Sequence, residues 1–193
     1  MKKGTKLLSI ILLFSIAAKS QITKGNWMIG GNANFSFSSI NTETGITKTT
    51  TINLAPNIGY FFVDKFAGGI RLSVYKNHIK FGQPNNNSTT FSNYRIGPFV
   101  RYYFLPADKQ YNILTEINYQ FGNEKVETNT SSGTNIKSNV FSFSAGPVIY
   151  FNSSVGIEFL LNYSSSGNNI NSSRGSSLGI GIGLQIHLEN DKN

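Results

Sequence analysis

Three segments of this chain are variants of one another, and their recurrence limits the possible fold more than any other feature. They are residues 57–62 (NIGYFF), 96–104 (IGPFVRYYF) and 145–151 (AGPVIYF). Each is an extended run that closes on aromatic residues, and each is followed by a short polar turn and a second alternating run. Their spacing of roughly 40 to 50 residues fits one long hairpin plus one long loop. The sequence therefore predicts repeated hairpins with one tight end and one longer end.

Strict alternation of apolar and small or polar residues predicts eight strands. The expected strands are 27–39, 50–62, 66–76, 93–104, 110–122, 139–151, 155–164 and 177–188. Soluble strands are most often about 5–6 residues long, whereas a tilted strand needs about 9–11 residues to cross a bilayer. The expected lengths indicate membrane-spanning strands.

The less apolar face of these strands decides between two kinds of barrel. It carries Gly, Ser, Asn and Gln with few charges, and these side chains suit the crowded interior of a barrel of eight strands. A soluble barrel, such as a lipocalin, would place apolar residues inside and charged residues outside. We therefore expect an all-β fold, an eight-stranded antiparallel up-and-down transmembrane β-barrel that occupies residues 21–193.

The N-terminal segment predicts export. Lys2, Lys3 and Lys6 precede an apolar stretch over 7–18, and small residues at Ala18 and Ser20 mark a cleavage site before Gln21. The alternative, a membrane-spanning helix, is disfavoured because about a dozen apolar residues do not cross a hydrocarbon core of about 30 Å. Residues 1–20 are expected to be a signal peptide.

Charge and cysteine content exclude several classes of function. The formal charge is +8, with 17 Lys and Arg against 9 Asp and Glu. Four of the lysines lie in the expected signal peptide, so 13 basic residues remain against 9 acidic ones, a net charge of +4. That balance, without a basic helix, does not indicate a nucleic-acid partner. The absence of cysteine excludes disulfides and thiol chemistry.

Five charged residues have the strand parity of the interior face: Arg71, Arg95, Arg101, Glu116 and Glu158. Such a set can form a selectivity ring, or it can form a structural network that neutralises its own charges. We favour the network, because an eight-stranded lumen leaves little room for a channel. Glu116 is expected to pair with Arg95 or Arg101.

The sequence offers little support for catalysis. The only histidines are His78, expected in an outer loop, and His187, expected at the opposite end and facing the lumen or the membrane interface. No nucleophile and base share one surface, and no His, Asp or Glu cluster has metal-ligand spacing. We expect no enzyme activity, no catalytic residue, no cofactor and no metal.

The chain resembles the small outer-membrane β-barrel proteins of Bacteroidetes-type bacteria, within the superfamily of the OmpA transmembrane domain, OmpW and OmpX. The resemblance rests on the signal peptide, on residues 24–31 (KGNWMIGG) and on residues 97–104 (GPFVRYYF). It implies a fold and a location rather than an activity. The last strand is expected to end on Leu188 rather than on the usual aromatic residue, and we expect no peptidoglycan-binding domain and hence no anchoring role like that of full-length OmpA.

Loop lengths predict how the barrel lies in the membrane. Short turns should be periplasmic together with both termini, and the segments 40–49, 77–92, 123–138 and 165–176 should be external loops. The expected role is structural or surface-interacting, and the alternative is a narrow pore for small solutes. The expected partners are outer-membrane lipid and the barrel-insertion machinery, for a monomer whose external ligand the sequence does not identify.

Overall fold

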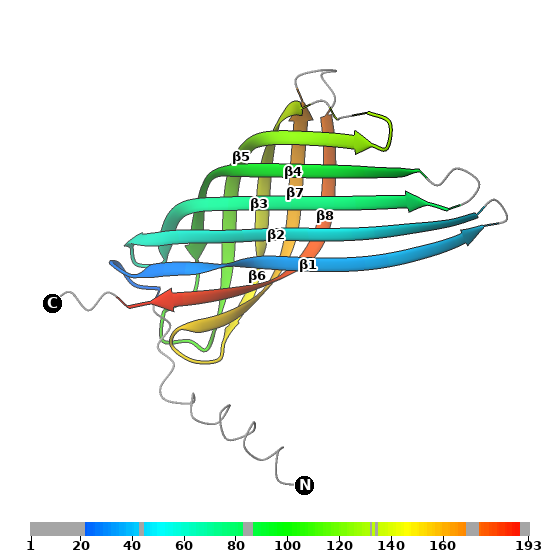
Figure 1. The fold of residues 1–193 in the computed structure, drawn as a ribbon. Coiled ribbons are helices and arrows are strands. Elements are labelled where there is room, and N and C mark those ends of the chain that lie inside the picture. The colour runs from blue at the N-terminus through cyan, green and yellow to red at the C-terminus, as the bar shows by residue number, and fades with distance from the viewer. Residues whose placement is uncertain are drawn as a thin grey trace, which may run out of the picture.

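The protein forms one closed antiparallel β-barrel of eight strands, as the sequence predicts (Figure 1). The structure is a computed structural model that describes residues 22–42, 45–82, 87–131, 133, 135–168 and 174–189, so the expected signal peptide lies outside the described residues. The strands are β1 (Trp27–Thr42), β2 (Gly45–Val63), β3 (Phe66–Phe81), β4 (Ser88–Tyr103), β5 (Tyr111–Thr128), β6 (Asn135–Tyr150), β7 (Val155–Asn168) and β8 (Arg174–Leu188). Within the described ranges, no helix is long and apolar enough to cross a membrane.

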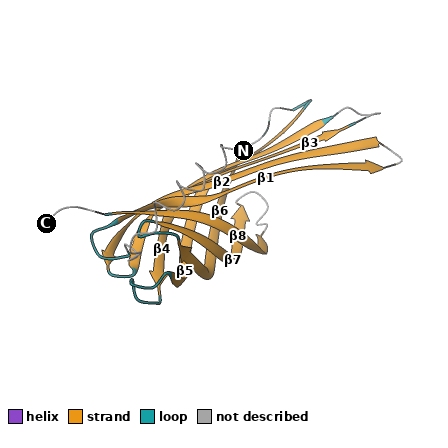
Figure 2. Ribbon diagram, turned by 90° about the horizontal axis from the view of Figure 1, so that it is seen from below, coloured by secondary structure: helices purple, strands orange, loops and turns teal. Residues whose placement is uncertain are grey.

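The two ends of the barrel differ, and we name them by the chain. At the terminal end the chain enters through residues 22–26 and leaves after Leu188, and Figure 2 shows the teal turns of this end. These turns lie at residues 64–65, 104–110 and 151–154, where the sequence predicts them. The entering segment is tied to the first turn, because the Lys24 amide donates to Asp64 Oδ1 at 2.8 Å. The opposite, far end carries the longer hairpins.

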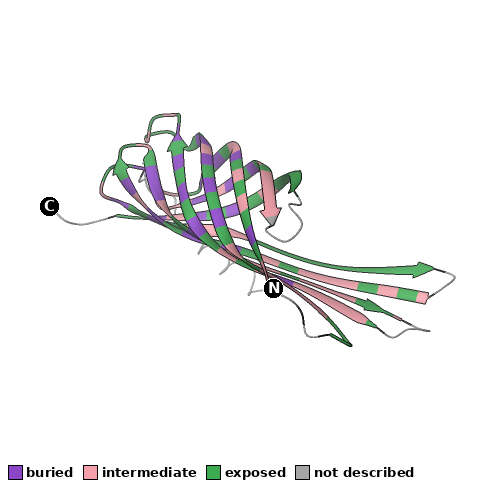
Figure 3. Ribbon diagram, turned by 90° about the horizontal axis from the view of Figure 1, so that it is seen from above, coloured by how far each residue is buried: buried purple, intermediate pink, exposed green. Residues whose placement is uncertain are grey.

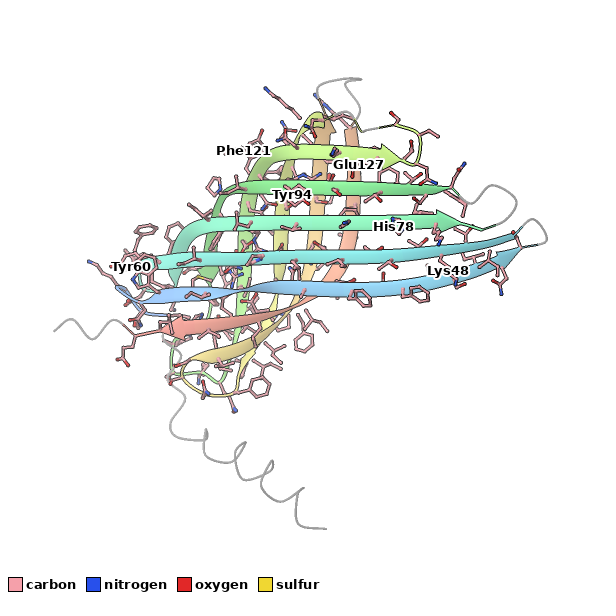
Figure 4. All side chains as sticks on the ribbon, viewed as in Figure 1. Lys48, Tyr60, His78, Tyr94, Phe121 and Glu127 are labelled. Atoms are coloured by element: carbon pink, nitrogen blue, oxygen red, sulfur yellow. The ribbon has the colours of Figure 1, made fainter. Side chains whose placement is uncertain are left out.

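The outward face is an apolar band between two groups of aromatic residues. On β4 these residues are Tyr94 and Tyr102, eight residues apart, which is about 26 Å along a strand. That length fits a lipid-facing band about 25 Å tall with aromatic girdles at both edges. Figure 4 shows Tyr60 at the terminal end and charged side chains such as Lys48 and Glu127 toward the far ends of the strands. In the described strands, no outward side chain between the girdles is charged.

The strands are longer than the sequence predicts, and the expected external loops are wrong in extent. Strands span 14 to 19 residues, and most of the segments 40–49, 77–92, 123–138 and 165–176 belong to them. Gly45 lies seven residues beyond Ile52, so β2 extends about 23 Å past the point where its regular apolar alternation stops, with Ile46 as an isolated apolar residue in the extension. These extensions are rich in Thr, Ser and Asn. They escaped prediction because strand pairing continues in water after the apolar alternation stops.

Three prolines within the outward face coincide with interruptions in the ladder. The pairing of β2 with β3 skips from Leu54 to Asn57, around Pro56. The pairing of β4 with β5 skips around Pro98, and that of β6 with β7 skips around Pro147. A proline has no N–H to give to a ladder, so each interruption lies on the side where that donor is missing. The repeated Gly-Pro and Ala-Pro steps of the sequence therefore mark local breaks in the barrel wall.

The buried core lies in the terminal half of the lumen. Figure 3 shows buried residues concentrated there, while the extensions at the far end are intermediate or exposed. The apolar members of this core are Ile22, Met28, Phe61, Ala67, Phe99, Tyr103, Leu114, Val148, Tyr150 and Leu160. Every strand except β8 contributes a residue to this core. Ile22, from the segment that precedes β1, belongs to it at the terminal end. The buried side chains of the interior therefore gather in the terminal half of the barrel.

The outward band predicts a position-dependent cost for a charge. Ile117 lies on the outward face of β5 within the band, whereas Asn123 lies on the same face of the same strand and is level with Tyr94 of the far girdle. In phospholipid vesicles, Ile117→Arg should lower the free energy of unfolding by about 2–4 kcal/mol, and Asn123→Arg by about 0–1 kcal/mol. Urea titrations followed by tryptophan fluorescence measure both values. Equal losses would contradict a membrane-embedded outward face.

Candidate functional site

Four of the five predicted interior charges form one cluster across the lumen. Arg101 Nη2 lies 2.7 Å from Glu116 Oε2, and Arg101 Nη1 also pairs with Glu158. Arg71 Nη2 lies 2.7 Å from Glu116 Oε1, so Glu116 bridges two arginines. Two positive and two negative groups balance, and all four residues are more than nine-tenths buried. The cluster connects β3, β4, β5 and β7 through side chains as well as through the ladder.

Small residues on neighbouring strands make room for this cluster. Arg71 on β3 is level with Gly97 on β4, so its guanidinium can pass over β4 and reach Glu116 on β5. Glu158 is level with Gly183 on β8, where an added Cβ would lie 3.3 Å from Glu158 Oε2. Alternation alone gives the side to which each charge points. Which charges meet depends on the register of the strands around the barrel.

Sequence reasoning missed the neutral partners of the cluster. Arg101 Nη1 donates to the Tyr103 hydroxyl at 3.1 Å and to Gln185 Oε1 at 3.2 Å. The Phe99 ring centroid lies 5.8 Å from Arg71 Cζ and 6.0 Å from Arg101 Cζ, so the ring is within cation–π distance of two guanidinium groups. Such cation–π contacts are strengthened where water is excluded. The inward parity of these residues could have placed them in the lumen. It could not predict their contacts, because parity does not give the position of the end of a long side chain along the barrel axis.

Arg95 stays apart from the cluster, so the alternative pairing of Glu116 with Arg95 is not formed. Its Nε donates to the Ser138 hydroxyl at 3.2 Å, and its side chain is partly exposed. Arg95 is level with Gly122 on β5, six residues beyond Glu116. That offset is about 20 Å along the strand. The distance explains why inward parity alone was not enough to predict the partner.

Aromatic side chains and His187 seal the terminal side of the cluster. The His187 ring packs against Phe61, Tyr103 and Tyr150, with centroid distances of 5.5, 6.0 and 5.7 Å. It is 1% exposed, and neither ring nitrogen has a hydrogen-bond partner among the described residues. His187 is thus part of the packing of the lumen. The other histidine, His78, lies in β3 rather than in a loop, and its Nδ1 is 2.9 Å from Thr90 Oγ1.

The far half of the lumen holds a cavity of about 780 Å³. Its lining is mostly amide and hydroxyl side chains, with Arg71 at its floor and Arg95 in its wall. None of the ten apolar residues of the terminal core lines it. The lumen is therefore divided into a packed terminal half and a polar cup. Within the described ranges, no group of three His, Asp or Glu residues is placed to hold a metal ion.

Comparisons with known proteins identify the fold. No protein-family model matches the chain, and no curated protein matches it. The solved structures that it resembles include Neisserial surface protein A, at 18% identity over 84% of this chain and 97% of that one, with a TM-score of 0.56. The N-terminal β-barrel domain of OprF from Pseudomonas aeruginosa is 12% identical over 86% of this chain and 98% of that one, with a TM-score of 0.52.

A third similar structure is the outer membrane protein OprG of Pseudomonas aeruginosa. It is 10% identical over 90% of this chain and 100% of that one, with a TM-score of 0.53. All three identities are low, so the likeness concerns the fold. The chain has the closed eight-stranded barrel of solved outer-membrane barrel structures.

The geometry predicts which charges are energetically coupled. Glu116→Gln and Arg101→Gln should each lower the free energy of unfolding by about 3–5 kcal/mol, because each leaves a buried charge without its partner. The double variant should lose about 1–3 kcal/mol less than the sum of the single losses. The same cycle with Arg71→Gln should also show coupling, and denaturant titration of refolded protein measures it.

Arg95→Gln is the matched control for this cycle, since it removes the same charge from the same face of β4. Because Arg95 is far from Glu116, its loss should add to that of Glu116→Gln within about 0.5 kcal/mol. Coupling of Glu116 to Arg95 as strong as its coupling to Arg71 would contradict the cluster.

Proposed function

We propose that this chain is a non-enzymatic integral protein of the bacterial outer membrane with a structural or surface-interacting role. The supporting observation is the division of the lumen, whose terminal half is packed while its far half is a polar cup surrounded by long hairpins. In this proposal residues 1–20 are the signal peptide and residues 21–193 the mature barrel. The barrel-insertion machinery folds it as a monomer, without a cofactor or a nucleic-acid partner.

The asymmetry of the two ends supports one orientation. Bacterial barrels keep short turns and both termini in the periplasm and direct longer hairpins outward. The turns at 64–65, 104–110 and 151–154 lie at the terminal end, so the cup and the strand extensions would face the cell exterior. The named structural neighbours come from Neisseria and Pseudomonas. The affinity with Bacteroidetes-type proteins therefore rests on the sequence segments alone.

The alternative role, passage of small solutes through the lumen, conflicts with the packing of the terminal half. Arg101, Tyr103 and Phe61 are at most 1% exposed and lie in this terminal half. A continuous path would require the charge cluster to separate, which leaves buried charges unpaired. We therefore interpret the four clustered charges, Arg71, Arg101, Glu116 and Glu158, as structural. Contacts with the surroundings would use the far end.

The outer-membrane location is tested by fractionation. The mature protein should sediment with outer membranes, require detergent for extraction, and migrate faster in gels before heating than after it, because a closed ladder resists detergent unfolding. Cells that express the chain without residues 1–20 provide the control and should not deliver it to the membrane. Recovery of the full chain as a soluble monomer without detergent would overturn the proposal.

The absence of conduction is tested in planar bilayers. Purified, refolded protein should give no steady channels, because the packed terminal half blocks the lumen. The variant Phe61→Ala/Tyr103→Ala removes two large rings from that packing and serves as a positive control for opening. Steady conductance of the unmodified protein that changes with Arg101→Ala would favour the pore instead.

A further inference from the structure

The wall of the barrel has a seam between its first and last strands. β1 pairs with β8 only from Trp27–Leu188 to Asn32–Gly183, although β1 continues to Thr42 and β8 begins at Arg174. By contrast, β1 pairs with β2 along its whole length. In Figure 1, β1 runs across the picture while the upper part of β8 rises away from it. Beyond residue 32 both strands therefore expose an unpaired edge.

The seam opens within the apolar band. The outward residues next to the last pair are Ala33 and Phe35 on β1 and Ile180 and Ile182 on β8, and Ile180 is 84% exposed. Unpaired backbone groups are not tolerated against lipid unless they line a water-filled cavity or are otherwise satisfied. The seam thus brings hydrogen-bonding edges and lipid-facing side chains to one place.

Two cavities of opposite character meet at this seam. The polar cup inside the barrel reaches it, because Ile180 and Ile182 belong to the lining of the cup together with Asn32 and Ala33. An apolar groove of about 540 Å³ lies along the outer side and is walled by Ile29, Leu54, Ile157, Ile182, Leu184 and Ile186. Asn32, Ala33 and Ile182 line both cavities. The groove and the cup are therefore adjacent across the open part of the wall.

We propose that the seam binds a membrane lipid, with its polar head in the cup and an acyl chain in the groove. A polar solute would make no contact with the apolar groove. A plain hydrocarbon would give no hydrogen-bond partner to the amides of the cup or to the unpaired strand edges. A lipid matches both, since its phosphate and ester oxygens accept hydrogen bonds from Arg95, from the Asn side chains and from the edge N–H groups. The proposal rests on the outer-membrane location proposed above.

The test compares lipid retention by native mass spectrometry after refolding with dimyristoylphosphatidylglycerol. The unmodified protein should retain one lipid, and Ala33→Trp, which fills the seam, should lower occupancy at least fivefold. Ala145→Trp is the matched control, because Ala145 is also outward but lies on β6, paired on both sides. It should retain the lipid as the unmodified protein does. The gel shift on heating verifies folding of each variant, so a failed location and a failed seam are distinguishable.

A milder pair of variants covers the case in which Ala33→Trp does not fold. Ile182→Ala removes part of the groove wall and should lower occupancy about threefold, whereas Ile58→Ala, on the outward face of β2, should leave it unchanged. Equal occupancy in Ile182→Ala and Ile58→Ala, or in Ala33→Trp and Ala145→Trp, would overturn the proposal. Retention of no lipid by the unmodified protein would also overturn the proposal. The same holds if the protein retains lauric acid but no phosphatidylglycerol.

Discussion

The need to satisfy backbone hydrogen bonds without water governs this structure. A strand that faces hydrocarbon must pair on both sides, and closure of the sheet is the solution open to β-structure. The ladder meets this need around most of the wall, even where Pro56, Pro98 and Pro147 each remove a donor. Its weakest place is the β1–β8 seam, where the paired segment is short. The lumen cavity lies behind that seam and offers its edges a polar surrounding.

Filling the interior is the second constraint, and the two halves of the lumen meet it differently. In the terminal half, buried aromatic rings and a charge-balanced cluster occupy the lumen. The cluster does not by itself indicate high stability, because apolar residues of equal volume often serve as well as a buried ion pair. It does make the arrangement specific, since Glu116 must face both Arg71 and Arg101. In the far half, small amides and hydroxyls line a polar cup.

The far end of the barrel consists largely of strand extensions rather than of loops. Sequence composition indicates solvated loops there, but the structure has paired strands that carry Thr, Ser, Asn and Lys on both faces. A paired hairpin presents side chains in fixed register, whereas a loop of the same composition would not. Any contact at the far end would therefore meet an ordered surface. This follows from pairing, which needs no apolar face once the strand has left the membrane.

The sequence by itself determined the number of strands, their order, the side to which each residue points and the terminal turns, because alternation with period two is a local property. It also identified the five interior charges. Only the tertiary structure decided where each strand ends, that Glu116 meets Arg71 rather than Arg95, and that β1 separates from β8 after Asn32. These features depend on the relative height of strands around the barrel. That stagger is set by closure of the whole wall, which no single segment encodes.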